Sequence, residues 1–209
     1  MRHAPQNKTK GTRVTRGRPL SFDREAALDA AMVVFWEQGY EGTSIDELKR
    51  AMGLSASSIY AAFGAKEALY LKTIDRYRAT TGGFGKPIFE EAADARTALE
   101  RLLLSTASEL TRTDQPRGCM ISIALMYGSD EVASARSAVA EKRKIGIGAI
   151  RRRIQRDIDA GRLSKTVKAS ELTAFFVAVI QGMSARSRDG ASSAELEVIA
   201  RLAMKAWPD

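Results

Sequence analysis

The chain has 209 residues, 44% of them hydrophobic, which is enough to bury a sizeable core in one or two domains. No apolar run reaches the length of about 18 residues that a membrane span needs, so we expect no membrane partner. The net charge is +8, and the single cysteine, Cys119, excludes an intrachain disulfide framework and fits a reducing cytoplasm.

Residues 1–20 are predicted to form a basic N-terminal arm. It has no apolar centre, so it does not resemble a secretory signal. Six basic residues and no acidic residue precede position 22, and they are Arg2, Lys8, Lys10, Arg13, Arg16 and Arg18. A basic segment that also contains Pro and Gly is expected to be disordered alone and suited to a polyanion. A solubilising tail is the alternative.

A first helix is predicted over about 23–38. Asp23 is a candidate N-cap, and apolar residues then recur at helical spacing as far as Phe35. Gly39 follows as a typical stop signal.

Two short helices follow, and a tight turn joins them. Ser44 and Glu47 have the spacing of a capping box, and Gly53 ends the helix that they begin. Ser55 caps the next helix, which ends at Gly64. This arrangement is typical of a helix-turn-helix, whose second helix enters the major groove of DNA. Many helical hairpins share the turn pattern, so the interpretation gains weight mainly from the basic arm.

The rest of the chain has the pattern of further helices. They are predicted over about 66–80, 94–111, 131–160, 170–188 and 192–207. The apolar segment PRGCMISIALMYG, which precedes residue 131, fits a strand or a helix equally well by its periodicity. We therefore expect an all-α protein with a DNA-binding domain over 21–66 and a second helical domain over 67–209.

The segment AALDAAMVVFWEQGYEGTSIDELKRAMGLSASSIYAAFGAKEALY closely resembles the N-terminal domain of the tetracycline-repressor-like (TetR) transcriptional regulators. The matching positions are Ala31, Phe35, Gly39, Tyr40, Thr43, Leu48, Gly53, Ser55, Ile59, Tyr60, Phe63, Lys66, Glu67 and Leu69. Beyond about residue 70 the likeness is limited to helix order, the RGCM segment and length. The resemblance implies a homodimeric repressor that binds a palindromic double-stranded operator and that a small-molecule effector releases, with no cofactor.

By position, the resemblance assigns the DNA contacts to the start of each short helix and to the fourth helix. The residues are Thr43, Ser44, Ser55, Ala56, Ser57, Ser58, Tyr60, Ala61 and Lys66. Free N–H groups at a helix start suit phosphate oxygens, and Tyr60 and Lys66 add a hydroxyl and a charge. The alternatives are solvated serines at 57 and 58 and a packing role for Tyr60.

The small side chains of the third helix explain how it could read DNA. They let the backbone approach the groove floor, where serine hydroxyls pair with base edges and methyl groups touch thymine. Residues 23–66 hold seven acidic and four basic side chains, so the attraction to DNA must rely on the arm. There, Arg16 and Arg18 are candidates for an adjacent, narrow minor groove.

Two further sites are predicted in the C-terminal domain. The candidate lining of an effector pocket is Met120, Met126, Tyr127, Phe175, Phe176, Val179 and Met183, with core packing as the alternative for each. A homodimer is expected to form through the helices over 170–207, with Ile199, Leu202, Ala203 and Ala206 at the seam.

Other functions are less well supported. The only histidine, His3, lies in the arm, which argues against His-based catalytic triads and His-ligated metals, and no phosphate-binding glycine loop occurs. An enzyme is therefore disfavoured. An architectural DNA-binding protein without an effector remains the main alternative, which a cavity in the second domain would oppose. The basic run over 142–156 is expected to be a solvated helix face rather than a second DNA surface.

Overall fold

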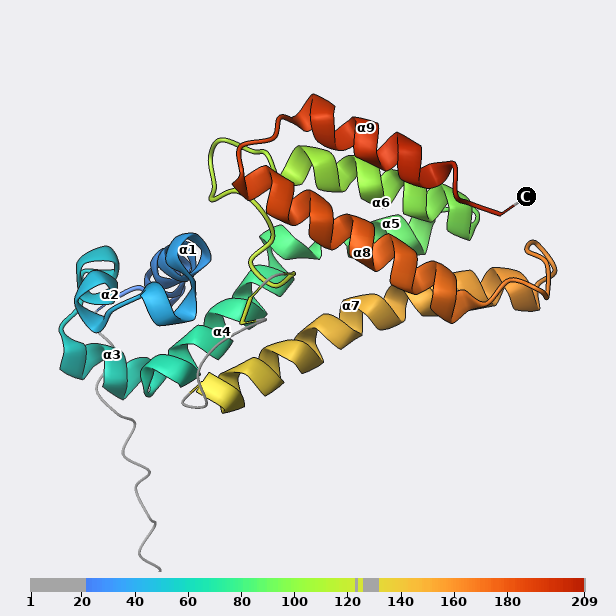
Figure 1. Ribbon diagram of the computed structural model, residues 1–209. Helices are drawn as coiled ribbons and strands as arrows, with labels where there is room; N and C mark the ends of the chain where they lie inside the picture. Colours follow the sequence, from blue (N-terminus) through green and yellow to red (C-terminus); the bar gives the residue numbers. More distant parts are fainter. Residues whose placement is uncertain (1–21, 123, 126–131, 209) are drawn as a thin grey trace, which may run out of the picture.

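The computed structural model describes residues 22–122, 124–125 and 132–208, and every regular element within them is helical (Figure 1). These elements are α1 (Arg24–Gly42), α2 (Ile45–Met52), α3 (Ala56–Phe63), α4 (Lys66–Ala79), the 3-10 turn η1 (Thr81–Gly83), α5 (Gly85–Glu91), α6 (Ala95–Glu109), α7 (Ala133–Asp159), α8 (Ala169–Arg188) and α9 (Ser193–Met204). The all-α prediction is confirmed. Arg16 and Arg18 lie outside the described residues.

Side-chain caps set the starts of the N-terminal helices. The Asp23 carboxylate accepts hydrogen bonds from the backbone N–H groups of Glu25 and Ala26, at 2.9 and 3.1 Å. Gly39, with φ 75° and ψ 176°, leaves the helical conformation, and one more turn follows before α1 ends at Gly42. The predicted stop at Gly39 is thus a kink close to the end of the helix.

The capping boxes predicted from the sequence are present. The Ser44 hydroxyl accepts from the backbone of Glu47, whose carboxylate accepts in return from the Ser44 N–H at 2.7 Å. Ser192 and Glu195 form the same pair at the start of α9. Such reciprocal bonds satisfy donors that a helix start leaves free, so they define where each helix begins.

The N-terminal helices and α4 share one hydrophobic core. Phe35 and Trp36 of α1 are 1% and 2% exposed, and they pack with the buried residues of α2 and α3. Helix α4 contributes Leu69, Tyr70, Ile74 and Tyr77 to the same core. A division at residue 66 would therefore cut through this core.

A second core lies between α6, α8 and α9 and continues onto α7 (Figure 1). Phe176 and Leu196 are fully buried in it, and the Phe176 ring lies 5.8 Å from that of Trp207. Within the part of the chain that the structure describes, none of the helices could serve as a membrane span.

Two parts of the fold differ from the sequence predictions. Helix α5 was not predicted, because its seven residues are too few to show a helical period. The apolar segment before α7 is neither strand nor helix over its described residues, which form turns. There Gly118 accepts a hydrogen bond from the Trp36 indole at 3.0 Å, so this loop joins α1 to the C-terminal helices.

Gly118 is expected to tolerate alanine poorly. Its φ is +79°, and an added Cβ would lie 2.9 Å from Arg188 Cγ and 3.1 Å from the Ser184 carbonyl oxygen. Gly161 is the matched control, because its φ is +72° but nothing lies within 4 Å of such a Cβ. Gly161→Ala should lower the free energy of unfolding by about 1 kcal/mol. Gly118→Ala should cost at least about 1 kcal/mol more, and equal losses in thermal or urea unfolding would contradict this packing.

Candidate DNA-binding surface and effector cavity

Three serine hydroxyls cluster at the start of α3. Ser55 Oγ accepts from the Ser58 backbone N–H at 3.2 Å and lies 2.9 Å from both Ser57 Oγ and Ser58 Oγ. Ser55 and Ser57 are exposed, and the Tyr60 side chain further along α3 is 47% exposed. Ala61 is exposed and Ala56 half-buried. The helix thus presents small polar and apolar groups, with no charged side chain among its own residues.

Thr43 does not have the surface position expected for a DNA contact. Its side chain is 1% exposed, and its hydroxyl donates to the Gly39 carbonyl at 2.7 Å, which ties the end of α1 to the start of α2. The carbonyl that accepts this bond belongs to the residue at which α1 is kinked. Ser44, the other residue predicted to contact DNA at the start of α2, is exposed.

The starts of α2 and α3 differ in charge. The first turn of α2 holds Asp46 and Glu47, and hydrogen bonds from Ser44 keep the pKa of Glu47 below its ordinary value. The first turn of α3 holds no acidic residue. A helix start attracts anions through its free N–H groups and its positive dipole end, and nearby carboxylates oppose that attraction. The start of α3 is therefore the better phosphate site.

Two cationic side chains near α3 lie over aromatic rings. Lys66 Nζ lies 4.6 Å from the centre of the Tyr40 ring, and partial burial lowers the pKa of this lysine. Arg24 lies over the Phe63 ring at 5.2 Å, and its guanidinium donates to the Ala62 carbonyl at 2.7 Å. Lys66 begins α4 just after α3 ends, and its predicted role in DNA binding stays a prediction. Arg24 was not predicted, because nothing in the sequence places the start of α1 beside the end of α3.

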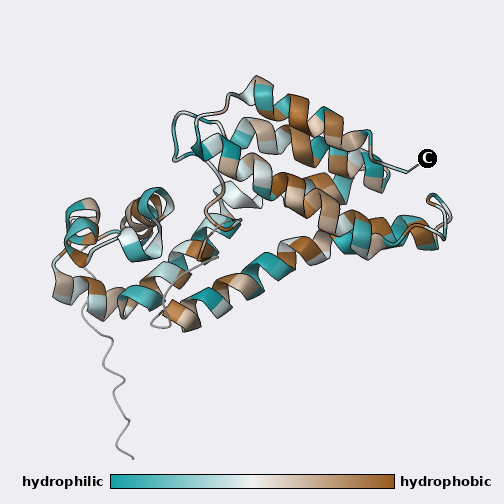
Figure 2. Ribbon diagram, viewed as in Figure 1, coloured by the Kyte–Doolittle hydropathy of each residue, from teal (hydrophilic) through white to brown (hydrophobic). Residues whose placement is uncertain are grey.

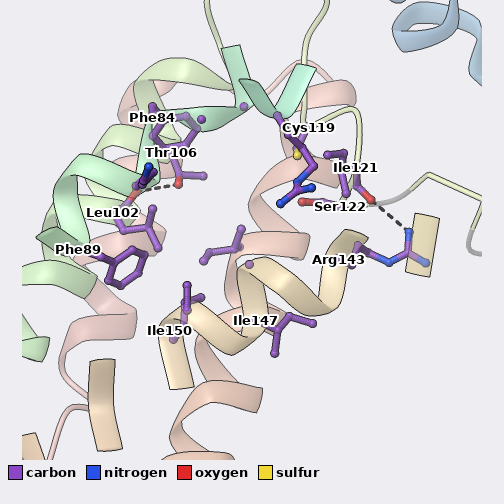
Figure 3. A pocket seen from close by; sticks show the side chains of 18 of the residues that line it. Phe84, Phe89, Leu102, Thr106, Cys119, Ile121, Ser122, Arg143, Ile147 and Ile150 are labelled. Atoms are coloured by element: carbon purple, nitrogen blue, oxygen red, sulfur yellow. Dashed lines mark hydrogen bonds between the residues drawn. The ribbon is translucent and has the colours of Figure 1, made fainter. Parts of the chain in front are cut away.

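A cavity of about 620 Å³ lies among α4, α5, α6, α7, α8 and the loop before α7. Its size is within the range of pockets that hold small molecules. Figure 3 shows Phe84, Phe89 and Leu102 on one side of it and Ile147 and Ile150 of α7 on another.

None of the described residues predicted to line an effector pocket reaches this cavity. Phe176 and Met183 are fully buried in the C-terminal core, and Val179 packs against that core. Met120 is buried in the N-terminal core, and Phe175 is 40% exposed at the surface. Met126 and Tyr127 lie outside the described residues. From α8, the cavity is lined instead by Val177, Ile180 and Gln181.

The cavity wall carries more positive than negative charge. Its charged lining residues are Arg78, Lys86, Glu90, Lys142, Arg143, Arg152, Arg153 and Arg156. The Arg143 guanidinium donates to the carbonyls of Ile121 and Ala124, at 3.2 and 2.6 Å. The basic run over 142–156 is therefore not simply a solvated face, as the sequence indicated, because part of it turns toward the cavity.

One aromatic contact connects the cavity to the DNA-binding helices. Tyr77 of α4 lines the cavity, and its ring meets the Trp36 ring edge-on, 4.8 Å between centres. Burial raises the pKa of the Tyr77 hydroxyl above its ordinary value. Trp36 in turn bonds to Gly118 in the loop that also supplies Cys119, Ile121 and Ser122 to the cavity wall.

Apolar side chains are exposed along α8 and α9, whose ribbons contain long hydrophobic stretches (Figure 2). Phe175, Val198 and Leu202 are 40%, 50% and 56% exposed. Of the predicted seam residues, Leu202 and Ala206 are exposed, and Ile199 is half-buried. Ala203 is 7% exposed, because it faces the chain's own core. It therefore cannot lie at a surface seam in this structure.

Comparison with known proteins identifies the family. Residues 27–73 match the model of the bacterial regulatory proteins of the tetR family. Over 208 residues the chain is 32% identical to the HTH-type transcriptional repressor ComR of Escherichia coli (strain K12), with 96% of each chain covered. The chain belongs to the TetR family. It is a DNA-binding transcriptional regulator and not an enzyme.

Two further relatives of this TetR regulator extend over most of its length. The HTH-type transcriptional repressor BdcR of Escherichia coli (strain K12) is 28% identical, with 91% of each chain covered. The solved structure of a cysteine mutant of the TetR regulator CifR, in complex with a 26-base-pair operator, is 35% identical and superposes with a TM-score of 0.88. That likeness covers 91% of this chain and all of the other.

Among the described residues, no group of three or more acidic, Cys or His side chains is placed to hold a metal ion.

Proposed function

We propose that this TetR-family regulator is a cytoplasmic homodimeric repressor that leaves a palindromic operator when a small molecule fills its cavity. The observation that carries this proposal is the position of Tyr77, which lines the cavity and packs on Trp36 in the core of the DNA-binding helices. The names of ComR and BdcR as repressors and the operator complex of CifR support it. An architectural protein that senses nothing would not need a cavity of this size.

The exposed apolar face of α8 and α9 is the proposed dimer interface. Phe175, Val198 and Leu202 would be shielded from water on pairing, as would Ala206. Burial of such residues is the main driving force of stable association. Two recognition helices held at a fixed distance of about 34–36 Å, or a multiple of it, could then enter successive major grooves.

The proposed DNA contacts divide into two kinds. Ser44, Ser55, Tyr60 and Lys66 bind phosphates, while Ser57 and Ser58, with the methyl groups of Ala56 and Ala61, touch base edges. Phosphate contacts fix the register on the duplex, and base contacts select sequence. Arg16 and Arg18 of the arm are proposed to enter the adjacent minor groove.

Release of the regulator from its operator would follow from a change in the position of α4. A ligand that favours another position of Tyr77 would move α4 together with the core that it shares with α1, and the two recognition helices would lose their operator spacing. The effect on operator affinity equals the ligand's differential affinity for the two states. Compounds that raise the melting temperature should therefore also weaken binding to an operator selected from random duplexes. Tight cavity ligands that leave operator affinity unchanged would reject this function.

The arm is expected to supply most of the electrostatic attraction. Deleting residues 1–18 should weaken DNA binding and flatten the fall of log K with log salt, by about 0.9 for each phosphate that the arm neutralises in the intact chain. The control is Arg151→Gln, which removes one exposed charge from α7 and should leave the slope unchanged. An unchanged slope in the deletion variant would show that the arm does not bind phosphates.

The division of contacts on α3 and α4 makes a second prediction. Tyr60→Phe and Lys66→Ala should weaken binding equally on operator and random DNA, because phosphates are alike everywhere. Ser57→Ala should cost about fivefold on the operator and much less on random DNA, since it removes one hydrogen bond to a base. Titration of both duplexes measures the difference. The reverse pattern would reject the assignment.

The hydrogen bond between Trp36 and Gly118 should orient the DNA-binding helices. Trp36→Phe keeps a ring in the N-terminal core but removes the hydrogen bond to the loop, and should weaken operator binding about fivefold. Trp207→Phe is the matched control, because that indole is also buried but lies in the C-terminal core. Equal reductions of operator affinity in the two variants, at equal stability, would show that the bond has no orienting role.

A further inference from the structure

One nitrogen of a buried guanidinium in the cavity wall lacks a hydrogen-bond partner within the described part of the chain. The Arg153 side chain is 6% exposed, and it donates from Nη2 to the Ala92 carbonyl at 3.0 Å. Its Nε is buried and has no hydrogen-bond partner among the described residues. A buried donor without an acceptor is destabilising, and such groups are rare in folded proteins. This N–H therefore calls for an acceptor that the polypeptide does not supply.

The neighbouring carboxylate cannot take this role. Asp157, one turn along α7, has its Oδ1 4.0 Å from Arg153 Nη2, beyond hydrogen-bond distance. Oδ1 accepts instead from Arg162 at 2.6 Å, and Oδ2 accepts from the Ala95 backbone N–H. Both oxygens are thus engaged, so Asp157 offsets part of the positive charge of Arg153 without satisfying its Nε.

Further positive charge surrounds this part of the cavity. Arg152 and Arg156 also line it, and helix geometry puts Arg156 one turn after Arg153. Both are exposed, and neither forms an ion pair within the part of the chain that the structure describes. Glu90 is the single acidic lining residue, and Lys86 lies 3.9 Å from it. Asp94 and Asp157 partly offset the charge of Arg153, but the lining as a whole carries more cations than anions and so favours an anion.

The rest of the wall suits an apolar body. One side of the wall consists of Phe84, just before α5, Phe89 on α5 and Leu102 on α6. Ile147 and Ile150 of α7 form another side (Figure 3). Ile150 lies one turn before Arg153 on α7, so the apolar wall leads directly to the guanidinium. A ligand here can bury hydrocarbon while its charged end meets a cation.

We propose that the cavity binds an apolar molecule with one carboxylate, and that the carboxylate pairs with the Arg153 guanidinium. A single charge fits because Asp157 already offsets part of the positive charge at this site. A neutral analogue can offer the guanidinium a hydrogen-bond acceptor but no negative charge, and this lost charge attraction is the physical basis of selection. This inference rests on the proposed effector function, since it names the chemical class that the effector cavity takes.

The test compares isosteric pairs that differ in charge. The probes are decanoate with decanamide, and 4-phenylbutanoate with 4-phenylbutanamide, titrated at pH 7.5 against the full chain by calorimetry. At least one carboxylate should bind at least about tenfold tighter than its amide, as one charge-assisted hydrogen bond provides. Equal affinities within both pairs, or no binding by either carboxylate below about 1 mM, would overturn the proposal.

Variants of Arg153 then test whether this residue causes the preference for carboxylates over amides. Arg153→Gln should reduce the preference for carboxylate to less than about threefold, whereas Arg151→Gln, on the exposed side of α7, should leave it intact. Arg153→Lys keeps the charge but lacks the Nε donor, and should lower the preference while supporting the fold. A full preference in a folded Arg153 variant would overturn the assignment. If Arg153→Gln does not fold, Arg153→Lys and the wild-type pairs still decide the outcome.

The same titrations separate this inference from the proposed function. Carboxylate binding that depends on Arg153 but leaves operator affinity unchanged would support the ligand class and reject the effector role. Neutral compounds that release the operator, with no preference for carboxylates in either pair, would support the effector role and overturn the ligand class.

Discussion

Helix α4 packs in the core of the DNA-binding helices and also reaches the cavity wall, and the arrangement of the whole regulator depends on this double role. One face fills the core of the DNA-binding helices with Leu69, Tyr70 and Ile74, and the far end brings Tyr77 to the cavity wall. The Arg76 guanidinium also bonds both carboxylate oxygens of Asp29 on α1, at 2.7 and 2.8 Å. Since packed interiors do not deform continuously, a displaced Tyr77 would have to move the helix and its core as one body.

The electrostatics of the DNA-binding helices are unusual for a protein that binds a polyanion. Seven acidic side chains outnumber four basic ones over 23–66, and two of the acids sit in the first turn of α2. Under the proposed function, the weakly attractive recognition surface would select sequence through small contacts, and the arm would supply affinity for any duplex. Affinity and specificity then depend on different parts of the chain, so salt should affect the first more than the second.

Helix boundaries could be predicted because they follow from local chemistry. The caps at Asp23, Ser44, Ser55 and Ser192 each satisfy backbone donors of the next turn, and such bonds need no distant partner. The cavity lining could not be predicted in the same way. Helix α8 is apolar on several sides, so its hydrophobic period does not tell which side faces the core and which faces a void. The burial of Thr43 was not predicted either, since it depends on tertiary packing that the local sequence does not reveal.

The sequence of α7 contained a signal that its basic run is not solvated throughout. Ile150, Ile154 and Ile158 recur every four residues and are buried, so they mark the inner face of the helix. Arg153 and Asp157 each lie three positions after one of these isoleucines, and residues three apart share a helix face. Their spacing of four also suits an ion pair, whereas Arg151 and Gln155 fall on the outer side and are exposed. A buried charge beside a void is costly unless something pairs with it. The run of arginines therefore combines solvated charges with one buried guanidinium, that of Arg153, for which we propose a ligand carboxylate as the partner.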